Sequence, residues 1–372
     1  MKVWPVVGIV CMLGILLLAH SFIYNTWFVF WGSSGPVIDL VLRAALFVLA
    51  FSFIAAALLG FRFSNVLVST LYKIAAVWLG LLNFFFLAAI LCWLVWLALW
   101  LSPLASSLPA HRPLIAAVLY SLAVAAGIYG LLNARWIRVR HVAVTLPGLP
   151  ESWRGRTALV LSDLHLGLIN GRRFSRRIAA AATRLQPDII FLPGDIFDGT
   201  KADPHKLAAP LLEIAPPFGI YYTTGNHEEF GDAAHYSAAM TGAGVRVLSN
   251  ELVTVDGLHI LGVPFGDTSP IRLRATLKAL SPAHGQASIL LNHVPNRLPI
   301  VEEAGISLQL SGHTHGGQVF PFTWITRRAF GKFTYGLQVF GALQVYTSSG
   351  AGTWGPPMRV GTHPEMVLLT FE

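Results

Sequence analysis

The first third of the chain alternates long apolar runs with short segments that carry charge. Four runs contain no Asp, Glu, Lys or Arg: residues 3–38, 44–61, 74–110 and 113–134. A spanning helix needs about 20 mostly apolar residues. The pattern therefore predicts four transmembrane helices, near residues 3–23, 40–60, 74–100 and 114–132. An alternative for the first run is a cleaved signal peptide, since Lys2 precedes it, but the run is longer than the apolar core of such a peptide.

After this region the chain changes to short apolar runs that end in polar clusters. "TALVLSDLH", "DIIFLPGD" and "GIYYTTGNHEE" are separated by helix-like stretches, which is typical of βαβ units. Later runs, such as "ASILLNHV" and "ISLQLSGHTH", are mostly strand-like. We expect a membrane region at 1–139 and, at 140–372, an α/β domain that is richer in sheet in its second half. Open α/β sheets bind ligands beyond the carboxyl ends of their strands, where these polar clusters lie.

Charge predicts how the chain is oriented in the membrane. The chain is 54% hydrophobic, 12% charged and has a net charge of +8. Basic residues that flank membrane spans and contact anionic headgroups account for this positive charge, so nucleic-acid binding is not needed to explain it. Most basic residues near the spans fall on one side: Lys2, Arg62, Lys73, Arg135, Arg138 and Arg140. The other side has Arg43 and Arg112. The positive-inside rule then predicts a multi-pass protein of the cell membrane, with both termini and the soluble domain in the cytoplasm.

The cysteine content restricts the possible metal ligands. The chain has two cysteines, Cys11 and Cys92, and both lie in predicted spans. This excludes a disulfide framework and a cysteine-rich zinc site. A metal ion would have to be held by His, Asp and Asn.

Five polar clusters follow one another along the soluble part: "SDLHLG", "GDIFDG", "GNHEE", "LNHVP" and "SGHTHGG". They supply these candidate ligands: Asp163, His165, Asp195, Asn226, His293, His313 and His315. Taken singly, each cluster has an ordinary explanation as a turn or a helix cap. Together, in this order and all at strand ends, they indicate a metal site.

The ligand types and their number indicate which metals would bind. Residues i and i+2 of a strand share a face, so we expect Asp163 to approach one ion with His165, and His313 to pair likewise with His315. Imidazole and carboxylate suit Zn, Mn or Fe rather than Ca. Seven ligands are too many for one ion and suit two divalent ions about 3.5–4 Å apart that share a carboxylate.

The series "DLHLG…GDIFD…GNHEE…LNHVP…GHTHGGQ" resembles the calcineurin-like metallophosphoesterase superfamily. The tail "GTWGPPMRVGTHPEMVLLTF" is similar to its bacterial membrane-associated phosphodiesterase branch. The resemblance covers residues 140–372 and implies a four-layer α/β (α+β) sandwich, two facing mixed sheets with helices on both outer faces. The four apolar helices are not part of the superfamily's shared core.

The resemblance also implies roles for individual residues. One ion would be held by Asp163, His165, Asp195 and His315. The other would be held by Asp195, Asn226, His293 and His313, with Asp195 as the bridge. Two such ions polarise a phosphate and lower the pKa of a bound water, so that hydroxide attacks phosphorus. His227 would serve as the catalytic proton donor or as support for the ligands, and Asp198 as a residue that orients a ligating histidine.

These observations predict a membrane-tethered metallophosphoesterase that hydrolyses a phosphodiester or pyrophosphate bond. We expect its substrate to be a phospholipid or a lipid-linked nucleotide, since a membrane anchor raises the local concentration of such substrates. UDP-diacylglucosamine pyrophosphatases of the same superfamily give one concrete candidate. Two alternatives remain: the same chemistry on a soluble cytoplasmic substrate, or a non-enzymatic membrane sensor whose metal site is structural.

Two further stretches have ambiguous roles. Arg172, Arg173, Arg176 and Arg177 open the helix-like stretch after "DLHLG". They could bind a second phosphate, contact anionic headgroups or form a solvated helix face. The apolar residues of "WITRRAF" and "GTWGPPM" could line an acyl-chain groove, but we expect them to belong to the core.

Overall fold

The computed structural model describes residues 3–103, 108–282 and 285–372. The chain forms two compact units. One comprises Met1–Leu132 with Gly355–Met358, and the other Asn133–Trp354 with Arg359–Glu372. The division falls before the predicted boundary at residues 139 and 140, and the first unit also takes in a short piece of the C-terminal tail.

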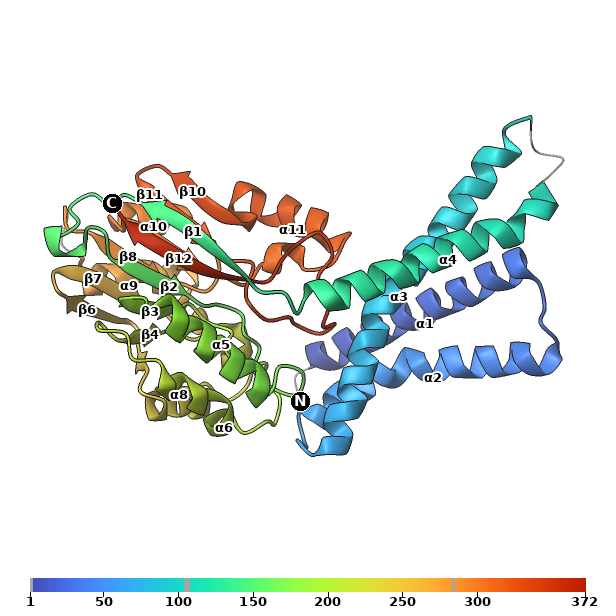
Figure 1. Ribbon diagram of the computed structural model, residues 1–372, viewed down its shortest axis with the longest axis horizontal. Coiled ribbons are helices and arrows are strands. Elements are labelled where there is room, and N and C mark those ends of the chain that lie inside the picture. The colour runs from blue at the N-terminus through green and yellow to red at the C-terminus, as the bar shows by residue number, and fades with distance from the viewer. Residues whose placement is uncertain (1–2, 104–107, 283–284) are drawn as a thin grey trace. The chain divides into compact units, whose positions relative to one another are not determined.

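Four long helices make up the membrane unit (Figure 1): α1 (Val3–Trp31), α2 (Pro36–Gly60), α3 (Val66–Trp100) and α4 (Leu108–Asn133). Each contains an apolar window long enough to cross a membrane, as predicted. Helix α1 continues beyond the predicted end at residue 23, because the sequence stays apolar until Gly32, whose φ is 92°. Pro36 then occupies the first turn of α2, where its missing N–H costs nothing.

Two pairs of polar side chains inside the membrane unit satisfy one another. The Nδ1 of His20 lies 2.7 Å from the carbonyl of Leu16, and its Nε2 accepts a hydrogen bond of 3.0 Å from the indole of Trp78. The indole of Trp93 donates to the hydroxyl of Thr26 at 2.9 Å. A polar group without a partner is costly in hydrocarbon. Both ring nitrogens of His20 are therefore occupied by structural contacts.

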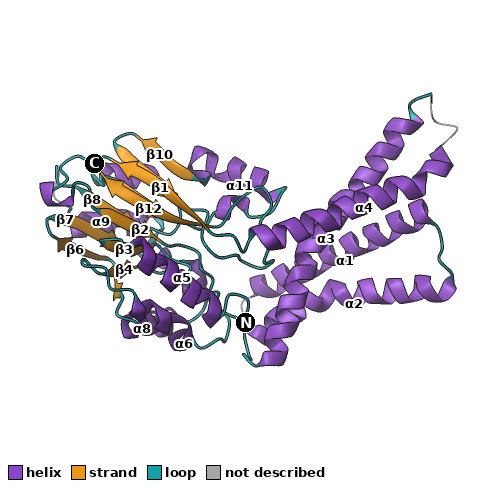
Figure 2. Ribbon diagram, in the orientation of Figure 1, coloured by secondary structure: helices purple, strands orange, loops and turns teal. Residues whose placement is uncertain are grey.

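The second unit contains two six-stranded sheets (Figure 2). The first has the order β1 (Arg138–Val144), β12 (Glu365–Phe371), β2 (Thr157–Val160), β3 (Ile189–Leu192), β4 (Ile220–Tyr222), β5 (Arg246–Val247). The second has the order β10 (Gly336–Phe340), β11 (Leu343–Thr347), β9 (Leu308–Ser311), β8 (Ser288–Leu291), β7 (Leu258–Gly262), β6 (Glu251–Val255).

Both sheets are mixed. Strands β2 to β5 run parallel, as do β7, β8, β9 and β11, whereas β12, β6 and β10 pair antiparallel with β2, β7 and β11. The carboxyl ends of β2, β3 and β4 therefore meet at one edge of their sheet. Those of β8 and β9 meet at one edge of the other.

Helices cover the outer faces of both sheets. A core that includes Ile178, Ile190 and Ala239 joins the first sheet to α5 (Arg172–Leu185), α6 (Pro204–Ala208) and α8 (Ala233–Gly242). A second core, with Leu273 and Leu290, joins the other sheet to α9 (Pro270–Leu280) and α10 (Leu298–Glu303). The predicted order of helices, sheet, sheet and helices is confirmed.

The two sheets pack directly against each other. Their shared core includes Val160 and Phe191 from one sheet and Ile289 and Leu310 from the other, all fully or almost fully buried. Burying a side chain of this size contributes about 1.5–3 kcal/mol. The strands are thus fixed rigidly, and the loops at their carboxyl ends have a firm support.

Candidate metal centre

Five loops carry the predicted ligands, and each follows a strand. Asp163 and His165 come after β2, and Asp195 comes after β3. Asn226 follows β4 as the first residue of α7 (Asn226–Phe230). His293 follows β8, while His313 and His315 follow β9. Both sheets therefore contribute to one site, as their parallel strands lead one to expect.

Most of these ligands have an unusual backbone conformation. Asp163, His165, Asp195, His313 and His315 all have φ between 45° and 68°. Residues other than glycine seldom adopt this left-handed region, and such strain clusters at functional sites. The predicted strand geometry for the two pairs was wrong, since β2 ends at Val160 and β9 at Ser311. Tight left-handed turns bring Asp163 and His165 into one ligand group instead, whereas His313 and His315 belong to different groups.

One group of ligand atoms consists of Asp163, His165 and His315. The two Nε2 atoms of the histidines lie 3.0 Å apart. The Oδ1 of Asp163 lies 3.4 Å from the Nε2 of His315 and 3.9 Å from that of His165. All three side chains are buried.

A second group consists of Asp195, His293 and His313. The Oδ2 of Asp195 lies 3.0 Å from the Nε2 of His293. The Nδ1 of His313 lies 2.8 Å from the Oδ1 of Asn226. A third group, of His165, Asp195 and His227, links the first two, so Asp195 and His165 each belong to two groups.

These separations fit ligands that share an ion. Two donors that are each about 2.1 Å from an ion and at right angles to each other lie about 3.0 Å apart. The closest pairs in both groups have this spacing. The buried Nε2 of His293 lies 3.0 Å from the Oδ2 of Asp195 but lacks the angles of a hydrogen bond. A divalent cation would satisfy both atoms.

Glycines lie directly against the carboxylates. A Cβ on Gly312 would collide with the carboxylate of Asp163, and a Cβ on Gly225 would collide with that of Asp195. The backbone N–H groups of His313 and His227 donate to these carboxylates at 3.0 Å and 2.9 Å. The glycines thus let the backbone approach closely enough to orient the ligands.

Burial keeps several of the imidazoles neutral. Burial lowers the pKa of His313 to about 4 and holds the pKa values of His165 and His315 well below their usual range. Burial raises the pKa of Asp163 to about 6. Metal ligation requires an unprotonated imidazole, so these three histidines can bind a cation at neutral pH without first losing a proton.

His293 and Asp195 form the opposite case. Burial alone would lower the pKa of His293, but the carboxylate of Asp195 outweighs it and raises the pKa to about 9. Burial likewise opposes ionisation of Asp195, yet His293 lowers the pKa of that carboxyl below its ordinary value. The two side chains therefore form an ion pair. A bound cation would take the place of the imidazole proton, which would be released.

His227 lies beside His165, with 4.8 Å between the two ring centroids. It is half-buried, and its Nδ1 lies 3.2 Å from the carbonyl oxygen of Asp198. A carbonyl only accepts, so Nδ1 carries the proton and Nε2 is left free. His227 also offers a ligand atom to the group of His165 and Asp195. The geometry therefore allows either a ligand or a proton donor at this position.

The carboxylate of Asp198 joins two loops of the site, and the role of this residue in orienting a ligating histidine stays a prediction. The carboxylate accepts from the N–H of Leu168 at 3.2 Å, and from the N–H and hydroxyl of Thr200 at 2.8 Å and 2.6 Å. These contacts join the loops after β2 and β3. Only the backbone carbonyl of Asp198 reaches a histidine, His227.

Sequence reasoning assigned no role to two buried charged residues beside the site. Glu228 is fully buried and accepts from the N–H groups of Asp195, Phe197 and Gly225 at 3.0, 2.9 and 2.7 Å. Its position next to His227 in "GNHEE" was the available signal.

Arg359 is also fully buried. Its guanidinium donates to the carbonyls of His315, Ser349, Gly350 and Gly352 at 2.6–3.1 Å, and lies 3.2 Å from the Nδ1 of His315. It was detectable as an isolated arginine within the glycine-rich and apolar tail. Arg359 therefore fixes the backbone of a predicted ligand.

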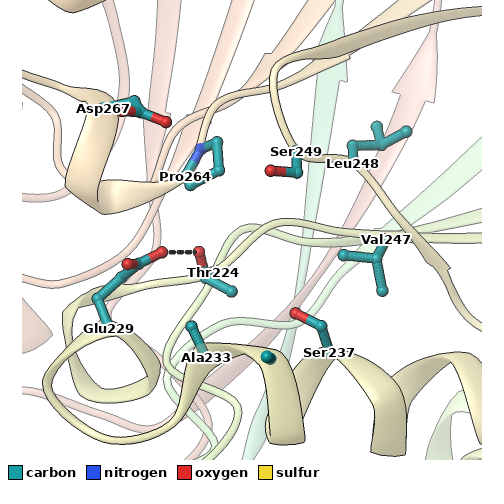
Figure 3. A pocket seen from close by; sticks show the side chains of 10 residues that line it. Thr224, Glu229, Ala233, Ser237, Val247, Leu248, Ser249, Pro264 and Asp267 are labelled. Carbon is teal, nitrogen blue, oxygen red and sulfur yellow. Dashed lines mark hydrogen bonds between the residues drawn. The ribbon is translucent and has the colours of Figure 1, made fainter.

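A cleft of about 320 Å³ lies beside α7 (Figure 3). Thr224, Glu229, Ser249 and Asp267 line part of it, and the hydroxyl of Thr224 donates to Glu229 at 2.6 Å. Its lining among the described residues includes none of the seven predicted ligands. The cleft is therefore separate from the candidate metal centre.

The calcineurin-like phosphoesterase family profile matches residues 156–317, a range that contains all seven predicted ligands. The chain is similar to an uncharacterized metallophosphoesterase of Aquifex aeolicus, with 30% identity over 68% of this chain and 98% of that protein. The chain belongs to the metallophosphoesterase family. It is also similar to a transmembrane protein with metallophosphoesterase domain of Danio rerio, with 31% identity over 66% of this chain and 60% of that protein.

This metallophosphoesterase spans less than two thirds of the Danio rerio protein. Among solved structures it is similar to a dimetal phosphatase of Danio rerio, with 12% identity, a TM-score of 0.38, and coverage of 53% of this chain and 88% of that one. That likeness is too slight to carry an argument. The four apolar helices and the transmembrane relative identify a membrane protein.

Proposed function

We propose that the protein is a membrane-tethered phosphoesterase that uses two divalent cations to hydrolyse a phosphodiester or pyrophosphate bond. The observation that carries the proposal is the convergence of three overlapping ligand groups that share Asp195 and His165. Family membership supports the same reaction class. Imidazole and carboxylate donors suit Mn, Fe or Zn.

We assign Asp163, His165, Asp195 and His315 to one cation. Asp195, Asn226, His293 and His313 are assigned to the other, with Asp195 between the two. The close approaches of His165 to His315 and of His293 to Asp195 support this division. When bound, two cations would polarise a phosphate and lower the pKa of a bound water.

The protein's own residues orient this chemistry and supply a proton. Backbone N–H groups fix the carboxylates of Asp163 and Asp195, and these loops rest on buried strands. We assign the general acid to His227. Its Nδ1 is held by the carbonyl of Asp198, so a protonated ring presents its Nε2–H to the leaving oxygen.

The membrane helices support a substrate that is itself in the membrane. A tether of four spans confines the site to the bilayer surface and raises the effective concentration of lipid-linked phosphate esters. We propose a phospholipid or a lipid-linked nucleotide as the substrate, and the cytoplasm as the side on which the catalytic unit lies, from the distribution of basic residues.

The first experiment tests the metal centre in the full-length protein in detergent. Asp195→Asn should abolish Mn²⁺-dependent hydrolysis of an activated phosphodiester, with a loss of at least about 10³-fold, because a shared anionic ligand is lost. Metal content measured by mass spectrometry should fall with it. Removal of metal by a chelator should silence the wild type reversibly.

Asp256→Asn is the matched control. Asp256 is an exposed aspartate with φ of 48°, close to the 52° of Asp195. Asparagine must therefore adopt a similar left-handed backbone conformation at both positions. Its activity and metal content should equal those of the wild type. Metal-independent turnover, or an unchanged rate in Asp195→Asn, would contradict the proposal of a metal-dependent enzyme and favour a structural metal site.

A panel of substrates separates the lipid hypothesis from its alternative. Full-length protein in mixed micelles should cleave lipid-linked phosphate esters faster than soluble nucleotides. Preference for a soluble cytoplasmic nucleotide would instead make the helices a simple anchor.

A further inference from the structure

Helix α11 (Phe322–Phe330) has an inverted distribution of polar and apolar residues. The positions that face the domain, Thr323, Thr326 and Phe330, are half-buried and follow the i, i+3, i+7 spacing of one helix face. The outward positions include Phe322, Trp324 and Ile325, which are 51%, 68% and 60% exposed. A helix on a water-exposed surface would place its apolar residues inward.

This arrangement corrects the expectation that "WITRRAF" belongs to the core. No residue of α11 is buried. Trp354, in the second apolar stretch, is 57% exposed. Met358, in contrast, is buried, within the tail segment that belongs to the membrane unit.

We propose that α11 and Trp354 form a membrane-contacting surface, which inserts Phe322, Trp324 and Ile325 among the headgroups of the bilayer. A helix with tryptophan and phenylalanine on one face and arginines beside them lies in the interface, about 5–10 Å deep. Arg327 and Arg328 are exposed. They take part in none of the ion pairs found among the described residues, so they can meet anionic lipid.

The chain path favours a bilayer over a protein as the occupant. Trp354 is followed directly by Gly355–Met358, which belong to the unit of membrane helices. The second unit begins at Asn133, where α4 ends. The chain therefore crosses between the two units three times, at residues 132–133, 354–355 and 358–359, and this tethers the catalytic unit to the membrane helices.

The surface adjoins the candidate metal centre. The ring of Phe330 lies 6.1 Å from that of His313, and the ring of Trp354 lies 5.8 Å from that of His227. Phe320, in the loop that follows the last ligand, stacks edge-on against Trp324 at 4.7 Å. If the proposed function holds, a lipid-linked phosphate could reach the site along this apolar rim without leaving the bilayer.

The test uses nitroxide labels at two exposed isoleucines of the full-length protein. Cys11→Ser and Cys92→Ala remove the native thiols, and Ile325→Cys or Ile271→Cys supplies the attachment site. Ile271 is 85% exposed on α9, so the control site is likewise an exposed isoleucine on a helix. The protein is placed in nanodiscs of phosphatidylcholine with phosphatidylglycerol, one copy per disc.

Collision with oxygen reports lipid, and collision with a nickel chelate reports water. The label at 325 should have an oxygen-to-nickel accessibility ratio several-fold higher than the label at 271. Equal ratios, whether both labels lie in lipid or both in water, would overturn the proposal. Protection of the label at 325 from both reagents would also overturn it, in favour of a protein partner.

A second arm tests the role of the arginines without using enzyme activity. Arg327→Gln with Arg328→Gln should lower the ratio at 325 in discs that contain phosphatidylglycerol and leave it unchanged in phosphatidylcholine alone. An inactive enzyme with an inserted label would reject the proposed function and keep the membrane surface. An active enzyme whose label at 325 is exposed to water would support the proposed function and reject the membrane surface.

Discussion

At the scale of single residues, the site is organised by backbone strain and by buried charges behind the ligands. Five predicted ligands have left-handed backbone conformations, each of which costs of order 1 kcal/mol or more. Such conformations persist only where the surroundings fix them. Arg359 is one such fixing group, since it joins the carbonyls after β11 to the carbonyl of His315.

Replacement of Arg359 by methionine should weaken both metal binding and stability. The apolar stem is kept, but several buried carbonyls lose their donor, and each orphaned group costs about 1–3 kcal/mol. We expect stability to fall by about 3 kcal/mol or more, and the concentration of Mn²⁺ needed for half-occupancy to rise. Calorimetric titration and thermal unfolding in detergent measure the two effects.

Two further variants show whether Arg359 acts on the ligand. Arg359→Lys keeps some donors and should restore part of the metal affinity. Arg274→Met, at an exposed arginine that pairs with Glu303 at 2.8 Å, should change stability by less than about 1 kcal/mol. Metal affinity equal to the wild type in Arg359→Met would show that Arg359 supports the fold alone.

At the scale of elements, Glu228 joins the loop after β3 to the start of α7. One carboxylate oxygen accepts from the N–H groups of Asp195 and Gly225, and the other accepts from that of Phe197. Burial raises the pKa of this carboxyl to about 7, because the buried site disfavours its charged form. The three hydrogen bonds fix the loop of Asp195 relative to the helix that begins at Asn226.

Glu228→Gln should lower the unfolding midpoint and the metal content together. The amide has one accepting oxygen, so its NH₂ group must face at least one backbone N–H, and stability should fall by about 1–3 kcal/mol. Glu229→Gln is the matched control, because Glu229 is half-exposed and the oxygen of glutamine can still accept from Thr224. Equal losses of stability and metal content in the two variants would show that the effect comes from removing a negative charge from α7.

The same elements show what the sequence could and could not reveal. Short apolar runs predicted the strands, because buried parallel strands need little else. Candidate ligands could be proposed from residue type and order, but their conformation could not, since the left-handed Asp163 packs against Gly350 and Gly312, which are distant in the sequence. The outward face of α11 was also missed, because "WITRRAF" has the composition of a core helix and its direction depends on tertiary packing.

At the scale of the whole molecule, the four apolar helices and the candidate metal centre lie in different compact units. The membrane helices bury some of their polar groups against one another, as in the pair of His20 and Trp78. The predicted ligands of the catalytic centre all lie in the other unit. Orientation across the membrane then decides which pool of phosphate esters the site can reach.

Labelling of single cysteines in intact cells tests this orientation. Ser34 lies between α1 and α2, Ser64 between α2 and α3, and Ser269 in the catalytic unit, and all three are exposed. Basic residues near the ends of the spans place Ser64 and Ser269 on the cytoplasmic side and Ser34 on the opposite side. In a background without Cys11 and Cys92, an impermeant maleimide should therefore label Ser34→Cys in intact cells, and the other two only after permeabilisation. Labelling of Ser269→Cys in intact cells, with Ser34→Cys protected, would invert the topology and direct the site towards substrates outside the cytoplasm.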